Sequence, residues 1–245
     1  MTELVALKVD VILAAGTPAT LAAKKVTGDI PIVVATAGDP VGSGFAATLA
    51  RPGGNVTGLT NISSELVTKR LDLLRELMPK VQRVGLLYDP NNPLDTLSLA
   101  RFVAYCDKLK LQAVRAPMRR VDEIEEAFAT LTRNKAQGVI VSPAATNNAA
   151  RAIIAQYALK HRLPAIVGRA DYAEAGGLIS YAPDIPDLHR RSAAYVDKIF
   201  KGAKPGDLPI EQPTKFEFVG NMKTAKALGL KIPDSILVQA TKVIE

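Results

Sequence analysis

Short runs of apolar, mostly β-branched residues recur along the chain and are separated by amphipathic stretches. Nearly continuous hydrophobicity within a short run is typical of strands that are buried on both faces, as in a parallel sheet. Consecutive parallel strands need crossover connections, and the amphipathic stretches supply the helices for them. The alternation therefore predicts an α/β fold with right-handed crossovers. The predicted strands are Val9–Ala14, Ile32–Ala37, Val56–Thr60, Val84–Tyr88, Leu111–Arg115, Gly138–Val141, Ala165–Val167 and Leu178–Tyr181.

These strands are expected to form two sheets, and the strand at Asn55–Asn61 and the strand after Gly176-Gly177 are candidates for crossings between two domains. Residues 62–178 contain a self-contained series of strands and helices, and with residues 214–245 we assign them to domain two. Residues 1–61 and 179–213 are assigned to domain one. Within domain two, Asn147 is predicted to cap the helix that buries Ile154.

Composition allows a sizeable core and argues against several classes of protein. Of the 245 residues, 48% are hydrophobic, yet no apolar run is long enough to span a bilayer. The first four residues do not show the pattern of a secretory signal peptide. The single cysteine, Cys106, excludes an internal disulfide, and its place in an apolar-periodic stretch predicts a buried packing thiol.

The net charge of +7 and the pI of about 9.5 raise the question of nucleic-acid binding. The lysines and arginines are scattered, however, and most lie in or beside helical patterns with acidic residues nearby. Tryptophan is absent, so base stacking has few candidates. We therefore expect no nucleic-acid partner.

In open α/β sheets, ligands bind beyond the carboxyl ends of the strands. Thr17 is a candidate donor to a ligand carboxylate, and its alternative role is to cap the following helix. Asp39 is a candidate partner for a ligand ammonium, and its alternative role is to form a turn before Pro40. The candidate ligand-binding residues of domain one are Thr17, Thr36, Ala37, Asp39, Thr60 and Asn61.

The same rule selects strand-end residues in domain two. Tyr172 and Tyr181 are candidates for an aromatic wall, although each is also a common kind of half-buried tyrosine. Arg169 is a candidate for a ligand carboxylate, or alternatively for a surface salt bridge. The candidate ligand-binding residues of domain two are Asn91, Ser142, Thr146, Arg169, Tyr172 and Tyr181.

Enzyme chemistry has little support in the sequence. His161 and His189 lack metal-ligand spacing, and no nucleophile elbow or phosphate-binding lysine loop is present. Gly42–Ala47 matches the G-x-G-x-x-A nucleotide fingerprint, but residues 38–41 separate it from the preceding strand. We expect no catalytic residues, no metal and no cofactor. An intracellular nucleotide-binding α/β protein or enzyme that uses the Gly42–Ala47 loop remains the alternative.

Four segments, taken in order, resemble a known family. They are TPATLAAK (17–24), GDPVGSGF (38–45), LARPGGNVTGLT (49–60) and the run from Glu174 to Leu230. The similarity is to the substrate-binding proteins of a bacterial ABC-transporter family related to importers of tryptophan and other aromatic amino acids.

The resemblance implies a type I periplasmic binding protein-like architecture, in which two Rossmann-like domains with parallel sheets are joined by crossing hinge strands and hold a small ligand in an interdomain cleft. It implies a periplasmic receptor for an amino acid or related carboxylate, aromatic in some relatives, that delivers its ligand to an ABC permease of the inner membrane. Such proteins open with a strand, a helix, a second strand and a second helix, whereas TELVALKVDVI resembles the end of the second helix and the third strand. Domain one is therefore expected to be N-terminally truncated and prone to self-association.

Overall fold

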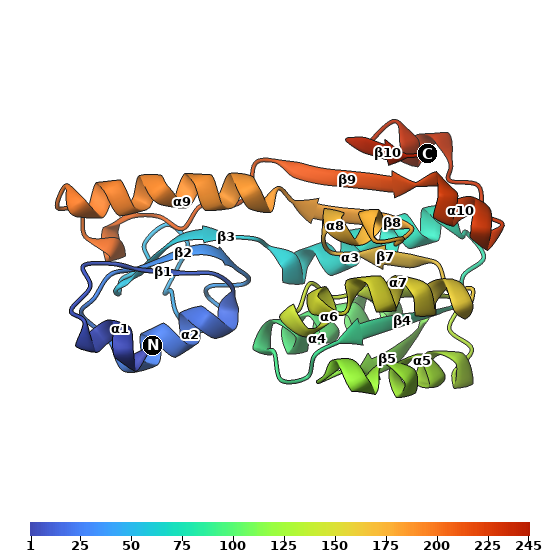
Figure 1. Cartoon of the computed structure of the whole chain (residues 1–245), viewed down its shortest axis with the longest axis horizontal. Coiled ribbons are helices and arrows are strands. Elements are labelled where there is room, and N and C mark those ends of the chain that lie inside the picture. Colours follow the sequence, from blue (N-terminus) through green and yellow to red (C-terminus); the bar gives the residue numbers. More distant parts are fainter. The chain divides into compact units, whose positions relative to one another are not determined.

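The computed structural model describes all 245 residues, which divide into two compact units (Figure 1). Unit 1 comprises Met1–Ile62 and Pro183–Lys215, and unit 2 comprises Ser63–Ala182 and Phe216–Glu245. The sequence assignment differs at the crossings, because the structure places residues 179–182 in unit 2 and residues 62, 214 and 215 in unit 1. Residues 179–182 belong to unit 2 because their strand, β8, pairs with strand β7 of that unit.

Unit 1 contains a three-stranded parallel sheet in the order β1-β2-β3. The structure begins β1 later than predicted, because pairing with β2 starts only at Ile12 and Lys8 has a positive φ of 50°. The elements of unit 1 are α1 (Thr2–Ala6), β1 (Ile12–Ala14), α2 (Thr17–Val26), β2 (Ile32–Ala37), β3 (Val56–Thr60), α9 (Ile185–Phe200) and a 3₁₀ turn (Pro205–Asp207).

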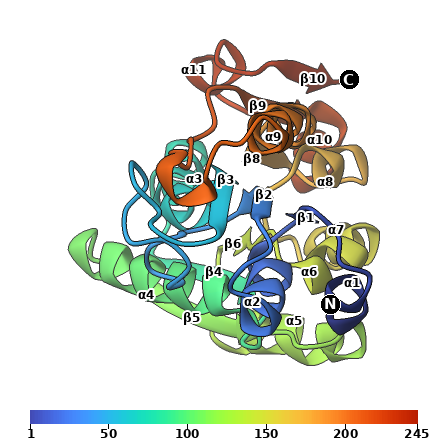
Figure 2. The ribbon, with the colours of Figure 1, turned by 90° about the vertical axis from the view of Figure 1, so that its left-hand side faces the viewer.

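Helices α2 and α9 cover opposite faces of this sheet (Figures 1 and 2). Successive residues of a strand point to opposite faces, so the apolar run of β2 supplies both cores. Ile32 and Val34 pack in the core on the α2 side. Val33 packs with Leu188 and Tyr195 of α9.

Unit 2 contains a seven-stranded sheet in the order β10-β9-β8-β7-β6-β4-β5. Strand β4 pairs in parallel with β5 and β6, β6 with β7, β7 with β8, and β9 with β10. Its strands are β4 (Arg83–Tyr88), β5 (Gln112–Pro117), β6 (Gly138–Val141), β7 (Ala165–Val167), β8 (Ile179–Pro183), β9 (Phe216–Asn221) and β10 (Lys242–Ile244).

The helices of unit 2 enclose two cores, one on each face of the sheet. Leu86 packs in the core that contains Cys106, and its neighbour Leu87 packs in the core that contains Phe128. Burial raises the pKa of the Cys106 thiol to about 12, which fits the predicted packing role. The helices are α3 (Ser63–Leu77), α4 (Pro93–Lys108), α5 (Ile124–Arg133, after a 3₁₀ turn at Val121–Glu123), α6 (Ala145–Ala149), α7 (Arg151–Lys160), α8 (Ala170–Glu174), α10 (Met222–Leu228) and α11 (Asp234–Leu237).

Strands β9 and β10 were not predicted from the sequence. In β9, Phe216 and Phe218 alternate with Glu217, so the strand lacks a continuous apolar run like that of β6. Strand β10 has three residues, too few to produce a pattern, and depends on pairing with β9. The α/β fold class itself is confirmed by the parallel strands and their crossover helices.

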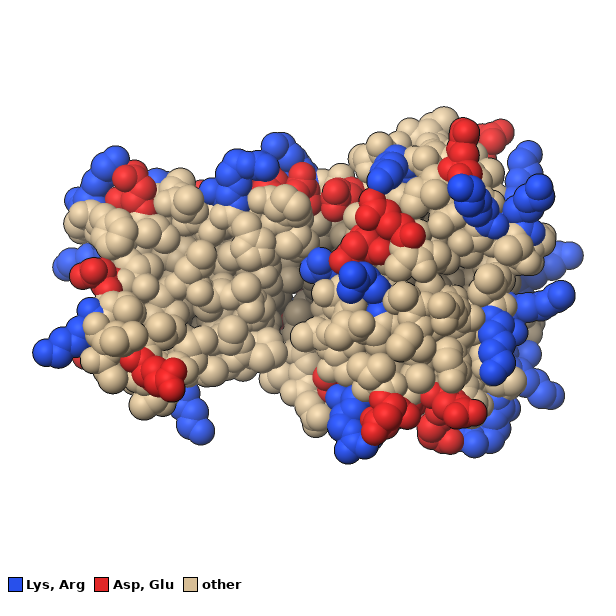
Figure 3. All heavy atoms as spheres, in the orientation of Figure 1, with Lys and Arg blue, Asp and Glu red and all other residues tan.

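No helix of the structure combines the length and apolar composition needed to cross a membrane. On the face shown in Figure 3, acidic and basic side chains are mixed over much of the surface, whereas lysines and arginines follow one another along the right-hand edge.

Gly58 in β3 has no room for a side chain. Its φ is +125°, and an added Cβ would lie 2.2 Å from the carbonyl oxygen of Val34 on the neighbouring strand. Gly58→Ala should therefore lower the free energy of unfolding by about 2 kcal/mol or more. Urea unfolding measures the loss, with Gly28→Ala as the control because no atom lies within 4 Å of its added Cβ. Equal stability of the two variants would contradict the prediction.

Candidate functional site

In unit 1, Thr17 joins the start of α2 to the loop that follows β2. Its hydroxyl donates to the Gly38 carbonyl oxygen (3.3 Å) and accepts from the Gly38 amide (3.1 Å). Thr17 is 2% exposed, and the capping position of α2 belongs to Gly16. The alternative role as a helix cap is therefore wrong, and the hydroxyl is already engaged in holding the strand-end loop.

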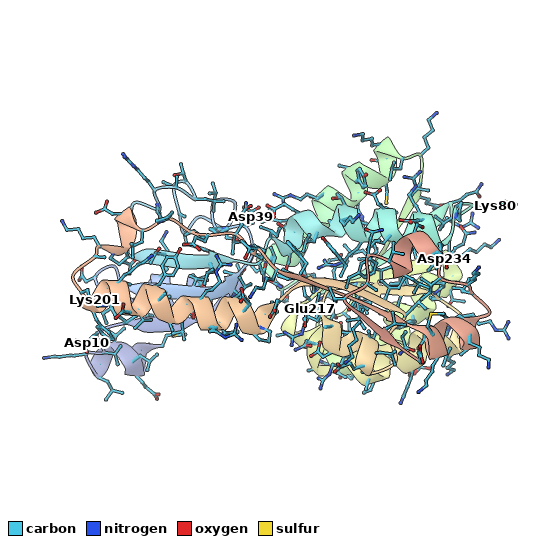
Figure 4. All side chains as sticks on the ribbon, turned by 90° about the horizontal axis from the view of Figure 1, so that it is seen from above. Asp10, Asp39, Lys80, Lys201, Glu217 and Asp234 are labelled. Atoms are coloured by element: carbon cyan, nitrogen blue, oxygen red, sulfur yellow. The ribbon has the colours of Figure 1, made fainter.

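Asp39 forms the turn after β2, with a positive φ of 43° that aspartate tolerates better than most residues. Its Oδ1 accepts a hydrogen bond from the Gly42 amide (2.9 Å). Figure 4 shows Asp39 at one end of unit 1 and Asp10 and Lys201 at the other. Asp39 thus has the expected turn role and also lies at the carboxyl ends of the strands.

Thr36, Ala37, Thr60 and Asn61 come together at the ends of β2 and β3. The Asn61 side-chain amide donates to the Thr36 carbonyl (2.7 Å), and the Asn61 backbone amide donates to the Ala37 carbonyl (2.9 Å). The Thr60 hydroxyl accepts from the backbone amide of Ile62 (3.2 Å). Three of the predicted site residues, Thr36, Ala37 and Asn61, therefore form one hydrogen-bonded group in unit 1, and Thr60 lies beside Ala37 in the strand register.

The Gly42–Ala47 loop does not have the geometry of a phosphate cradle, which needs free backbone amides. The amides of residues 42 to 47 all donate to atoms of the same region: to Asp39 and to the carbonyls of Pro40, Val41 and Pro52. A hollow of about 300 Å³ lies beside the loop, but Lys24, its one charged lining residue, donates to the Gly44 carbonyl (2.6 Å). The nucleotide interpretation therefore has no support from this loop.

In unit 2, three predicted site residues belong to one buried hydrogen-bond network. The Thr146 hydroxyl donates to Asp89 Oδ2 (2.7 Å), and the Asn91 amide donates to Asp89 Oδ1 (2.9 Å). The Ser142 hydroxyl donates to Asp95 Oδ2. Ser142 is 2% exposed whereas Asn91 is exposed, so Asn91 and the half-buried Thr146 are the predicted site residues of this network that a ligand can reach.

Asn147 belongs to the same network and does not cap a helix as predicted. It lies inside α6, fully buried, while the capping position of α7 belongs to Ala150. Its side-chain amide donates to the Ser142 hydroxyl (2.9 Å) and the Ser142 carbonyl (3.1 Å). The asparagine therefore fixes the loop after β6.

Two buried charges lie behind these loops. Arg70 of α3 is 1% exposed, and its Nε donates to the Tyr181 carbonyl (3.0 Å), while its Nη2 has no hydrogen-bond partner. Burial lowers the pKa of Arg70 to about 10. Burial also raises the pKa of Asp95 to about 6, against the hydrogen bonds from Ser142 and the Asp89 amide, which favour the carboxylate.

The remaining predicted residues of unit 2 have different surroundings. Arg169 makes a two-pronged ion pair with Asp171 (3.1 and 3.0 Å) and is partly exposed. The Tyr181 ring stacks on Phe216, with 5.7 Å between ring centroids. Tyr172 is 1% exposed and packs in the core with Phe128, so in this structure it presents no ring surface to a ligand.

Sequence reasoning missed two residues that organise these loops of unit 2, Arg70 and Asp95. It placed Asp89 in a strand-end loop without a role and gave Asn147 a capping role that the structure does not show. Arg70 occupies an apolar-periodic position between Val67 and Leu74, which was the one available sign that a charge would be buried there. Asp95 in the first turn of α4 resembles an ordinary helix-start acid. No three His, Cys, Asp or Glu residues of the chain gather closely enough to hold a metal ion.

The chain matches the profile of the family described as ABC transporter substrate binding protein over residues 1–244. A tyrosine-binding protein of Clostridioides difficile (strain R20291) is 26% identical over 227 residues, 91% of this chain. The match covers 64% of the length of that relative, so the chain spans less than two thirds of it.

Two solved structures superpose with a TM-score of 0.92 over 99% of this chain and 81% of theirs. One is an ABC domain from Streptococcus pneumoniae in complex with L-Trp, 28% identical. The other is a conserved domain protein from Vibrio cholerae, 27% identical. This similarity confirms the expected fold, in which mostly parallel α/β sheets form units of the type I periplasmic binding protein kind.

The Tyr172 hydroxyl is buried without a hydrogen-bond partner, and burial raises its pKa. Tyr172→Phe removes an unsatisfied polar group, so the free energy of unfolding should rise by about 1 kcal/mol. Tyr105→Phe is the control, because the Tyr105 hydroxyl donates to Asp72 (3.0 Å) and its loss should lower stability. Chemical unfolding of both variants checks the prediction, and a less stable Tyr172→Phe protein would contradict it.

Proposed function

We propose that this chain, which belongs to the ABC transporter substrate-binding protein family, is the solute receptor of an ABC importer. The observation that carries the proposal is the family match over residues 1–244, together with strand-end loops that are rich in hydrogen-bonding groups. Such a receptor has no catalytic step. The chain would act outside the cytoplasmic membrane, in the periplasm, and hand its ligand to a membrane permease.

The ligand class that we propose is an amino acid or a related small carboxylate, with an aromatic side chain favoured. Two relatives at 26% and 28% identity are a tyrosine-binding protein and a domain in complex with L-Trp. The chemistry of the strand ends suits such a ligand. In unit 1, Asp39 offers a carboxylate for an ammonium group. In unit 2, the Arg169 guanidinium offers donors for a carboxylate, and the Thr146 hydroxyl, which donates to Asp89, can still accept a hydrogen bond from a ligand. Thr17 would act through Gly38, which it holds in place.

Aromatic contacts to the ligand would come from Tyr181, whose ring is half-buried and stacked on Phe216. Ligand aromatic rings favour stacked or edge-on neighbours of this kind. Self-association through unit 1 is part of the same proposal. The outer edge of β1 has no partner strand, and Leu13 on that strand is 55% exposed.

A thermal-shift panel tests the ligand class. L-Tryptophan and L-tyrosine should each raise the melting temperature, because a ligand that binds only the folded state stabilises it by mass action, by about 2.7 kcal/mol at one hundred times Kd. Ribose and NAD serve as comparison ligands, and light scattering on the same samples reports self-association. Stabilisation by NAD or ribose with no effect of any amino acid would refute the proposal.

Replacing Asp39 tests its role in binding. Asp39→Asn keeps the acceptor for the Gly42 amide and the tolerance for positive φ but removes the charge, so the turn should survive. Binding of the amino acid should weaken by about 2–5 kcal/mol, because a desolvated ammonium would lose its partner. Titration calorimetry measures the change, with Asp10→Asn as the control at the opposite end of unit 1. Unchanged affinity would leave Asp39 with the turn role alone.

A further inference from the structure

Asp95 connects the two polar loops of unit 2 that follow β4 and β6. Its Oδ2 accepts from the Asp89 backbone amide (2.8 Å) at the end of β4 and from the Ser142 hydroxyl at the end of β6. Its Oδ1 accepts from the Asn92 side-chain amide (3.2 Å), and Asn92 caps α4. One fully buried carboxylate therefore fixes two strand ends and a helix start relative to one another.

The groups that a ligand can reach depend on this carboxylate. Thr146 and Asn91 both bond to the Asp89 side chain, and Asp89 is itself held through its backbone amide by Asp95. Ser142 holds Asn147, which lies beside Thr146 in α6. We propose that Asp95 is the positioning residue of the ligand-binding loops of unit 2, a role that rests on the proposed receptor function.

Only an ionised carboxylate suits these surroundings. The three hydrogen-bonding partners of Asp95 all donate to it, and Ser142 could accept from a protonated Asp95 only by turning its own hydrogen to another acceptor. If Asp95 is protonated or replaced by asparagine, it carries a hydrogen that faces another donor, and one of the two loops loses its acceptor. The Asp95→Asn side chain therefore has nearly the shape of the aspartate but no longer joins the loops that follow β4 and β6.

The pH dependence follows from the groups around Asp95. Asp89 lies on the preceding loop, Arg70 on α3 and Tyr172 on α8, and no histidine is among the groups that influence its pKa. Because burial raises the pKa of Asp95 to about 6, the carboxylate is mostly ionised at pH 7.5 and gains a proton as the pH falls through 6. Ligand affinity should then fall.

Protonation of Asp95 has the opposite effect on folding stability from its effect on ligand affinity. Its pKa in the folded state lies above the usual value, so its buried charge opposes folding above about pH 6, and protonation relieves that penalty below it. A merely structural role predicts that affinity and stability change together with pH. A positioning role predicts that affinity falls while this stability contribution rises, and the two measurements separate the cases.

The experiment compares wild type, Asp95→Asn and Asp107→Asn, a matched change at an exposed position of the same helix. Calorimetric titration with L-tryptophan and L-tyrosine is run at pH 5 and pH 7.5, and unfolding is measured at both. At pH 7.5, Asp95→Asn should bind about tenfold more weakly than the other two proteins. Wild type and Asp107→Asn should lose affinity at pH 5, and Asp95→Asn should not.

Two results would overturn the inference. If Asp95→Asn binds as tightly as wild type, Asp95 does not position the loops, and the proposed function stands. If wild type binds neither amino acid, the proposed function fails, but the role of Asp95 can still be tested. Hydrogen–deuterium exchange without ligand then shows whether Asp95 holds the loops. Exchange at the Asp89 amide and in residues 142–147 that is about tenfold faster in Asp95→Asn than in Asp107→Asn supports the inference. Equal exchange overturns it.

Discussion

Parallel pairing of short strands that are buried on both faces is the constraint from which both units follow. Such strands need helices on either side, so β2 sends Val34 towards α2 and Val33 towards α9. Parallel strands also end at one edge of their sheet, and in both units polar loops follow those ends. The loops combine Asn61 with Thr36 in unit 1 and Thr146 with Asp89 in unit 2.

Holding these loops requires buried polar and charged groups, which are costly unless they are hydrogen-bonded. In unit 2, not every buried charged group has all of its hydrogen-bond partners. Asp95 has three donors, whereas Arg70 retains an Nη2 without a partner. Buried charges of this kind lower the folding stability of the unit but fix the geometry at the strand ends. A receptor for a small ligand needs polar groups in fixed positions.

Strands with a clear local sequence pattern were predicted correctly, and strands without one were missed. The predicted bounds of Ile32–Ala37, Val56–Thr60 and Gly138–Val141 match the structure because each is a short run rich in β-branched residues and is bounded by a polar or glycine-rich loop. Strand β9 was missed because Glu217 interrupts its apolar residues, although pairing with β10 stabilises it. For the candidate site, the strand-end rule selected Asn91 and Thr146, which the structure joins to Asp89, but no local pattern distinguishes a buried Asp95 from an exposed helix-start acid.

The sequence by itself determined the α/β class, most of the strands and the positions of the loops, because these depend on periodicity and turn residues that are local in the chain. Only the tertiary structure decided what each polar side chain does. Ser142 and Tyr172 became buried, Thr17 became a support for Gly38, and Asp95 came to connect two loops. Hydrogen bonds and desolvation depend on atoms brought together from distant segments, such as Asp95 and Ser142, 47 residues apart.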